Sequence, residues 1–400
     1  MELPDGLGSL FVIVLVAAIT PLIASAVRRP RIPEVVLLLV AGVIVGPEVL
    51  DVAETPSAIV LLSNVGLGFL FFVAGFELDL SVLRGREGTA AGAAWGLSIL
   101  VSLAVVGVLA AIGYVHAFLP VAIALTTTAL GTLLPMLRDA GETGGTLGRA
   151  VLANGAVGEF LPIVAISMFL SARGAWQSLA LLAGFGLVAL LLTRATTRLR
   201  RHPVAALVRF GSESSAQTPV RVTMLLLVSL LLLAGELGLD VVLGAFAAGI
   251  VMRMALPEGD ESLERKIDGL AFGFFIPVFF VVSGMGVDID SIIASPGRLV
   301  VFFLLLLAVR GLSVLLVFRN RLPGREPLQL ALYAATGLPL IVAITQIGLS
   351  TGEMRPENGA ALVGAGLLSV LVFPMLATAI GRRRDPEDEA VPGAPLPEVR

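Results

Sequence analysis

The sequence contains no cysteine and a single lysine, Lys266. The missing cysteine excludes disulfide bonds and thiol chemistry, although it does not report the compartment. With one lysine and no GxxxxGK[ST] stretch, the glycine-rich segment 139–149 is interpreted as a flexible turn rather than a phosphate-binding loop. Both histidines, His116 and His202, lie in predicted loops. No basic tract carries interleaved aromatic residues, so the sequence predicts no nucleic-acid partner.

Charge is scarce throughout the chain. Only 14% of its 400 residues are charged and 57% are hydrophobic, whereas soluble domains have about 25% charged and about 45–50% apolar residues. The net charge of −3 is spread over predicted loops and indicates no particular partner. The N-terminus, "MELPDG", lacks the positive region of a secretory signal, so we expect the first apolar run to be a retained helix. This composition predicts an all-α, polytopic membrane protein.

Apolar runs long enough to cross a bilayer recur along the chain. A transmembrane helix needs about 17–25 such residues. Thirteen segments qualify, and they are 8–27, 31–49, 57–77, 88–113, 118–138, 148–171, 175–196, 220–236, 238–253, 267–286, 297–319, 327–349 and 357–380. We therefore predict one transmembrane domain over 1–381, numbered here as helices 1–13. The remaining residues, 382–400, are rich in Pro and Glu and predict a short disordered cytoplasmic tail.

The distribution of basic residues predicts the orientation. With the N-terminus outside and the C-terminus cytoplasmic, all but four of the 27 Lys and Arg fall in cytoplasmic loops or the tail. Three of the exceptions, Arg173, Arg298 and Arg355, lie in outer loops. This bias follows the positive-inside rule and places the protein in the cell membrane. The fourth exception, Arg310, lies inside helix 11.

Two stretches resemble each other, "FFVAGFELDLSVL" at Phe71–Leu83 and "FFVVSGMGVDIDSII" at Phe279–Ile293. Each ends a predicted span, helix 3 and helix 10. Because the two copies are offset by seven helices, an odd number, the second must be upside down in the membrane. Helices 2–6 and 9–13 then form two inverted five-helix repeats, an architecture of secondary transporters whose site lies at the repeat interface. The alternative is chance similarity between apolar helices.

The repeat pairs helix 5 with helix 12, and both carry helix-weakening residues. Helix 5 contains Thr126, Thr127, Thr128, Gly131 and Pro135, and helix 12 contains Thr336, Gly337 and Pro339. Such residues leave backbone carbonyls unpaired, which membranes tolerate only beside protein or a watery cavity. Freed carbonyls and half-helix ends are suited to a small ion. The alternative is an ordinary proline kink in each helix.

Helix 6 carries a glutamate, Glu159, with no other charged residue between Arg149 and Arg173. At about 1.5 Å per residue from the cytoplasmic edge, Glu159, Arg310, Thr128 and Thr336 all lie roughly 14–17 Å deep, close to the midplane. Asn154, Gly155 and Gly158 form a small-residue surface beside the acid, which leaves the carboxylate uncovered. A buried ion pair between Glu159 and Arg310 is the structural alternative. Because buried ion pairs stabilise weakly, we favour a titratable ion site.

These residues resemble those of the monovalent cation:proton antiporters, the sodium/proton exchanger superfamily, over nearly the whole chain. The similar stretches are "RIPEVVLLLVAGVIVGP", "FFVAGFELDL", "TTTALGTLLPMLRDAGE", "LGAFAAGIVMR" and "FFIPVFFVVSGMGVDID". The resemblance implies that Glu159 binds cation or proton and that Arg310 is the basic residue of helix 11, its charge partner. It also implies a homodimer, through helices 1 and 8, and a mobile core with crossed, broken helices 5 and 12.

The chain departs from the family in three ways. Glutamate replaces the usual aspartate, Gly158 stands where many members have an acid or amide, and the common cytoplasmic nucleotide-binding domain is not expected. Because arginine does not deprotonate in proteins, Arg310 cannot carry a proton. The sequence therefore predicts a secondary antiporter, not an enzyme and without a cofactor, that exchanges Na⁺ or K⁺ for H⁺, with electroneutral exchange favoured. The monovalent cation would be held at Glu159 by Thr126–Thr128 hydroxyls and the freed carbonyls.

Two other functions stay open on the sequence. An organic-anion symporter or channel on a related scaffold would use Arg310 as the counter-charge of its substrate. A membrane sensor or scaffold that transports nothing would use neither Glu159 nor Arg310 to bind an ion.

Overall fold

The computed structural model describes residues 6–26, 33–78, 85–131, 133, 137, 145–169, 180, 183–192, 194, 217–237, 239–255 and 261–381. Pro135 and the predicted tail 382–400 lie outside these residues. Every regular element in the described ranges is helical. Nine helical segments there are long and apolar enough to cross a bilayer, and Glu34–Val45, Ala183–Leu192 and Val241–Ala255 are shorter apolar helices. The predicted all-α, multi-pass architecture is confirmed, whereas the count of thirteen spans remains a prediction.

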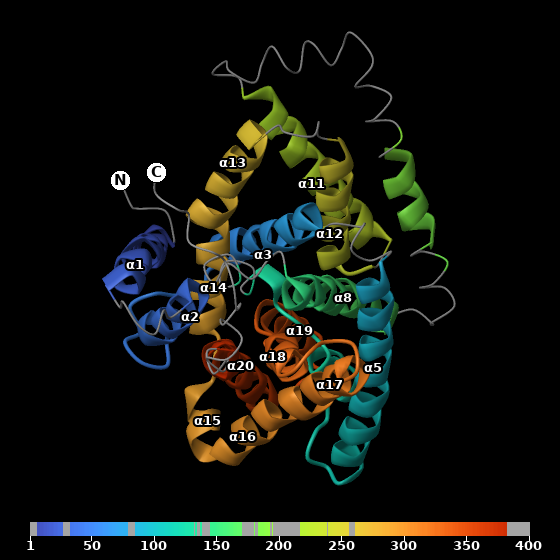
Figure 1. Ribbon diagram of the computed structural model, residues 1–400. Coiled ribbons are helices and arrows are strands. Elements are labelled where there is room, and N and C mark those ends of the chain that lie inside the picture. Colours follow the sequence, from blue (N-terminus) through green and yellow to red (C-terminus); the bar gives the residue numbers. More distant parts are fainter. Residues whose placement is uncertain are drawn as a thin grey trace, which may run out of the picture.

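The helices pack as two bundles, and Figure 1 shows the first in the upper and left part of the view. Its centre is the contact of α3 with α12, and α14 packs on both α2 and α3. The members are α1 (Leu7–Ala26), α2 (Glu34–Val45), α3 (Ser57–Glu77), α11 (Thr218–Glu236), α12 (Val241–Ala255), α13 (Glu261–Leu270), η1 (Ala271–Phe275) and α14 (Ile276–Met285). We call this group the first bundle.

The second bundle occupies the lower part of Figure 1. Here α5 packs on α8 and α17, and α20 packs on α16, α18 and α19. The members are α5 (Arg86–Ala111), α6 (Phe118–Ala124), α8 (Thr146–Phe169), α15 (Ile289–Ala294), α16 (Pro296–Leu305), η2 (Leu306–Gly311), α17 (Leu312–Phe318), α18 (Glu326–Ala334), α19 (Pro339–Ser350) and α20 (Pro356–Gly381). The main contacts between the bundles are those of α8 with α12 and of α2 with α20.

Glycines set the closest helix crossings of the first bundle. A Cβ at Gly249 of α12 would meet the Phe72 carbonyl of α3, and one at Gly42 of α2 would meet the Val281 carbonyl of α14. Small residues let membrane helices approach to backbone contact. Helices α3 and α14, which carry the two similar stretches of the sequence, are thus each met by such a glycine. This matched packing is what an inverted repeat requires, although the repeat itself remains a prediction.

Two spans contain a π-helical turn, η1 between α13 and α14 and η2 between α16 and α17. A π turn places one extra residue in a helical turn, so the side chains that follow are rotated relative to an uninterrupted α-helix, and such turns are frequent at functional sites. Arg310 and Gly311 end η2. The predicted deep base of helix 11 is therefore presented by an irregular turn.

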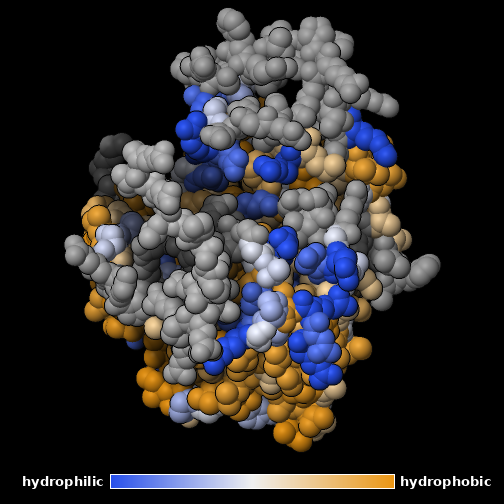
Figure 2. Space-filling view, in the orientation of Figure 1, coloured by the Kyte–Doolittle hydropathy of each residue, from blue (hydrophilic) through white to orange (hydrophobic). Residues whose placement is uncertain are grey.

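The surface matches a protein surrounded by lipid. Figure 2 shows hydrophobic side chains, in orange, over the lower part and flanks of the visible face, while hydrophilic ones, in blue, gather toward its middle and top. Among the exposed apolar side chains are Phe11 and Leu22 of α1 and Leu225 and Leu232 of α11, each more than 60% exposed. In a bilayer these side chains face acyl chains or another apolar surface, because water would not solvate them favourably.

Candidate functional site

Two helices break at one place in the second bundle. Helix α6 ends at Ala124, the chain is non-helical over 127–129, and helix resumes at Leu130. Similarly, α18 ends at Ala334, residues 336–338 are non-helical, and α19 begins at Pro339. The two breaks touch, because the Ala129 N–H donates to the Thr336 carbonyl at 2.8 Å. The predicted interruptions of helices 5 and 12 are thus present and adjacent, but in helix 5 the break lies at Thr127–Ala129, and the predicted break residue Gly131 belongs to the resumed helix.

Local chemistry explains the breaks. The Thr126 and Thr127 hydroxyls donate to the carbonyls of Ile123 and Ala124, at 2.8 and 2.9 Å. The N–H groups of the same two threonines donate to the same carbonyls at 3.0 and 3.3 Å, so the last turn of α6 is closed by its own threonines. In helix 12, Pro339 occupies the first turn of α19, where its missing N–H costs nothing. Both hydroxyls are therefore used within their own helix rather than directed at the acid.

Glu159 belongs to α8, and its carboxylate reaches the point where the second half of helix 5 begins, at Leu130. Its Oε1 accepts from the Leu130 N–H at 2.7 Å and from the Gly131 N–H at 3.4 Å. The first N–H groups of a helix have no partner within the helix and carry partial positive charge. A carboxylate at this position satisfies them. Its Oε2 forms no hydrogen bond among the described residues, and the side chain is partly exposed.

The small residues of α8 bring this acid to the break. The Gly158 carbonyl accepts from the Thr128 N–H at 3.0 Å. A Cβ at Gly158 would stand 2.5 Å from Thr128 Oγ1, and one at Gly155 would stand 2.6 Å from a Leu130 methyl carbon. Any larger residue at either position would push α8 away from helix 5. The predicted small-residue surface is therefore the contact surface with the broken helix.

Arg310 is completely buried and lies on the other side of the break. Its Nε donates to Thr128 Oγ1 at 3.0 Å and its Nη2 to the Asn154 carbonyl at 2.9 Å. The Thr128 hydroxyl in turn donates to the Ala334 carbonyl at 2.7 Å, the last residue of α18. Arg310 Nη1 and Asn154 Oδ1 are buried without a partner in the described part of the chain. The positive charge is thus directed toward a helix C-terminus.

The ion pair of Arg310 with Glu159, which the sequence left open as the structural alternative, is not present: no ion pair joins these two residues, and the hydrogen bonds of the guanidinium go elsewhere. The reason is the polarity of the half-helices. The carboxylate occupies the positive N-terminal end of one half-helix, whereas the guanidinium reaches, through Thr128, the negative C-terminal end of another. The two charges are stabilised by opposite ends of the crossing rather than by each other.

Ser369 also holds the helix-12 break in place, and the sequence did not predict this role. The Ser369 hydroxyl of α20 is fully buried, accepts from the Gly337 N–H at 3.1 Å, and lies 2.7 Å from the Gly366 carbonyl as a donor. It fixes the unwound backbone of helix 12 from outside. Ser369 is the only hydroxyl residue between Asn358 and Thr378 in an otherwise apolar helix, and that isolation was the available signal.

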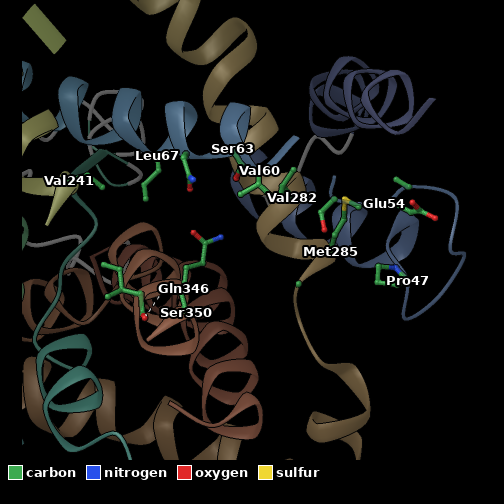
Figure 3. A pocket seen from close by; sticks show the side chains of 15 residues that line it. Pro47, Glu54, Val60, Ser63, Leu67, Val241, Val282, Met285, Gln346 and Ser350 are labelled. Atoms are coloured by element: carbon green, nitrogen blue, oxygen red, sulfur yellow. Dashed lines mark hydrogen bonds between the residues drawn. The ribbon is translucent and has the colours of Figure 1, made fainter. Parts of the chain in front are cut away.

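The bundles also meet around two cavities at one end of the molecule. The larger, of about 720 Å³, lies between α3, α12 and α14 of the first bundle and α19 of the second. Figure 3 shows Gln346 rising from α19 toward Ser63 and Leu67 of α3. The cavity is not lined by Glu159 or the helix breaks. Beside Glu159, in contrast, Gly131 is exposed, and a Cβ there would meet nothing within 4 Å.

A multi-pass helical protein in which two broken helices meet beside an isolated intramembrane carboxylate has the architecture of a secondary transporter. The family model for the sodium/hydrogen exchanger transmembrane domain matches residues 13–382. The chain therefore belongs to this family, which is one of transporters rather than enzymes.

Known relatives agree with this assignment. The chain is 25% identical to "Putative Na(+)/H(+) antiporter YjbQ" of Bacillus subtilis over 96% of its length, and 27% identical to "Na(+)/H(+)-K(+) antiporter GerN" of Bacillus cereus over 91%. It is 26% identical to "Glutathione-regulated potassium-efflux system protein KefC" of Salmonella heidelberg over 90%. The match covers 94% of GerN, but only 64% of YjbQ and 58% of KefC.

A solved structure shares the fold. The sodium proton antiporter MjNhaP1 from Methanocaldococcus jannaschii, at pH 8, superposes with a TM-score of 0.63. The superposition covers 94% of this chain and 98% of that one, at 20% identity. At this identity the similarity establishes the fold alone.

Proposed function

We propose that the protein exchanges a monovalent cation for H⁺ across the membrane, with both ions competing for Glu159. One observation carries this proposal: Oε1 is held by two backbone N–H groups, while Oε2 has no described protein partner. The N–H groups hold the carboxylate in place, and the second oxygen is left for a cation or a proton. Oxygen ligands suit alkali cations, and freed backbone carbonyls nearby would complete the shell.

The relatives support the choice of ions. YjbQ is named for Na⁺ and H⁺, GerN for Na⁺, H⁺ and K⁺, and KefC for potassium efflux. Exchange of Na⁺ or K⁺ for H⁺ is the activity that this chain's site can support with one carboxylate. Because the cation and the proton each bring one positive charge to the same group, we infer one-for-one, electroneutral exchange.

Arg310 has a supporting role in this proposal. An arginine remains protonated in proteins, so it contributes a constant charge and no proton. Its bonds to Thr128 and to the Asn154 carbonyl tie the helix-5 break to α8. An organic-anion site at Arg310 is disfavoured, because the side chain is completely buried and two of its nitrogens are already bonded.

Transport also requires alternating access to Glu159. We propose that the second bundle, which carries the acid and both breaks, moves against the first bundle. The N-terminus would lie outside and the C-terminus in the cytoplasm, as the arginine distribution predicts. Two copies would form a homodimer through the exposed apolar surfaces of α1 and α11, the helices predicted as 1 and 8.

Exchange in proteoliposomes with an internal pH dye tests the proposal. An inwardly directed Na⁺ or K⁺ gradient should make the vesicle interior more alkaline, because protons leave as the cation enters. Glu159→Gln should abolish this change, because an amide neither titrates nor carries charge. Glu236→Gln, at an exposed acid ending α11, is the matched control and should retain exchange. If Glu159→Gln folds and still exchanges, the proposal is wrong. Equal rates with membrane voltage clamped and unclamped are expected for electroneutral exchange.

A further inference from the structure

The large cavity marks a seam between the bundles. Ser63 and Leu67 of α3 and Val282 of α14 line it from the first bundle, and Gln346 and Ser350 of α19 line it from the second. It lies where α3 begins and where α14 and α19 end. Arg149 and Arg325, which the sequence predicts to be cytoplasmic, lie near the starts of α8 and α18, so the end of α19 is on the side of the membrane away from them. By the predicted orientation, this cavity opens on the outer face, and we call it the outer cavity.

A second cavity of about 480 Å³ adjoins the first. Val282, Gly286, Gln346 and Ser350 line both cavities, so these residues form the partition between them. Within the partition, Gln346 Nε2 donates to Ser283 Oγ at 2.8 Å. This bond joins α19 of the second bundle to α14 of the first. It therefore crosses the seam that relative motion of the bundles would open.

The surroundings of the bond suit an interaction that forms and breaks. Gln346 is half-buried between two cavities that could supply water to either partner. A hydrogen bond exchanged for bonds to water contributes little net free energy, whereas a fully buried one is costly to break. Thr345, the preceding residue, lines the second cavity, and its buried hydroxyl has no partner in the described structure. Buried hydroxyls normally find a partner, so the hydrogen-bonding groups at this seam are not all satisfied in the structure.

We propose that the Gln346–Ser283 hydrogen bond is a latch that holds the two bundles together across the wall of the outer cavity, keeping the cavity narrow and Glu159 closed off from it. It must break each time the acid is exposed to the outside. The inference rests on the proposed exchange only for its place in the cycle, because opening of the cavity can be measured without transport. Gln346 and Ser283 are positioning residues: they bias the two access states and do not bind the transported ion.

Thiol accessibility tests the latch, since the native chain has no cysteine. Leu67→Cys places one thiol in the wall of the outer cavity, where Leu67 is 6% exposed. A membrane-impermeant maleimide is applied to sealed right-side-out vesicles and, separately, to inverted ones. In the right-side-out vesicles, adding Gln346→Ala or Ser283→Ala should speed labelling of the Leu67→Cys thiol about twofold to tenfold, the ratio that one neutral hydrogen bond supports.

Ser350→Ala is the matched control. Ser350 lines the same two cavities, but its hydroxyl donates to the Ile347 carbonyl of its own helix. It should leave labelling unchanged, and Ser283→Thr, which keeps the hydroxyl, should restore the slow rate. Combining Gln346→Ala with Ser283→Ala should add nothing to either alone, because both remove the same bond.

Three results would overturn the latch. They are unchanged labelling in both Gln346→Ala and Ser283→Ala, an equal increase in Ser350→Ala, or additive effects in the double variant. Should Ser283→Ala fail to fold, Gln346→Ala decides the question, because its side chain lies in the cavity wall and its truncation leaves no core void. Labelling is independent of exchange, so a failed latch and a failed exchange proposal are distinguishable: only the latter is tested by Glu159→Gln.

Discussion

Gly158 gives the sharpest test of how the acid is positioned. In Gly158→Ala the new Cβ would lie 2.5 Å from Thr128 Oγ1, 2.6 Å from Thr128 Cβ and 2.8 Å from Arg310 Nη2. Non-bonded carbon atoms prefer about 3.5–4.0 Å, so α8 and the helix-5 break must separate by on the order of 1 Å. None of these neighbours is the free end of a long side chain with space to move into, because Thr128 and Arg310 are both buried and hydrogen-bonded.

The cost of Gly158→Ala can be worked from these contacts. Overpacking a tight interior costs about 1–3 kcal/mol. Loss of the bond from the Thr128 N–H to the Gly158 carbonyl adds about 0.5–1.5 kcal/mol. We therefore expect about 2–4 kcal/mol of destabilisation, seen as a lower midpoint of thermal unfolding in detergent. Exchange should fall more than tenfold, because the carboxylate is displaced from the N–H groups of Leu130 and Gly131.

Gly131→Ala is the matched control for that experiment. Gly131 is also a glycine beside Glu159, but a Cβ there meets nothing within 4 Å. It should keep exchange and leave stability unchanged or raised by up to about 1 kcal/mol, since alanine favours helix over glycine. If Gly158→Ala exchanges normally with an unchanged unfolding midpoint, or if both variants lose activity equally, the packing account of the site is refuted.

Two further predictions concern the surroundings of the site. Ser369→Ala should lower the free energy of unfolding by about 1–3 kcal/mol, because it leaves the buried Gly337 N–H unpaired. Thr378→Ala, whose hydroxyl bonds carbonyls of its own helix, should cost less. Equal unfolding midpoints in the two variants would contradict the role of Ser369 in holding the helix-12 break. Outside the spans, hydrogen bonds from the Ser291 hydroxyl and N–H lower the pKa of Asp288. A lowered pKa in the folded state means that this cap of α15 stabilises above the ordinary carboxyl pKa and is lost as pH falls through the lowered value. The protection factors of the amides of residues 289–294, which correct the exchange rates for the intrinsic effect of pH, should therefore fall in acid in the native protein, and Asp288→Asn should flatten that dependence.

The sequence was sufficient to identify Glu159, Arg310 and Thr128, which the structure brings together around the helix breaks. Composition predicted a multi-pass helical protein because apolar runs of this length satisfy their own backbone groups in lipid as helices. Counting residues from the charged helix ends placed Glu159, Thr128 and Arg310 at one depth, since helical rise is constant. The break residues of helices 5 and 12 were also readable, because threonine, glycine and proline weaken a helix wherever it lies.

Only the tertiary structure decided which way those side chains point. Depth fixes a residue's height but not the rotation of its helix, so the sequence left open whether Arg310 pairs directly with Glu159. The π turn that presents Arg310 and the polarity of the broken half-helices direct the two charges to opposite ends of the crossing. The hydrogen bond between Ser369 and Gly337 and the one between Gln346 and Ser283 could not be predicted from the sequence for the same reason. Each depends on which faces of two distant helices meet, and helix packing determines that, not local sequence.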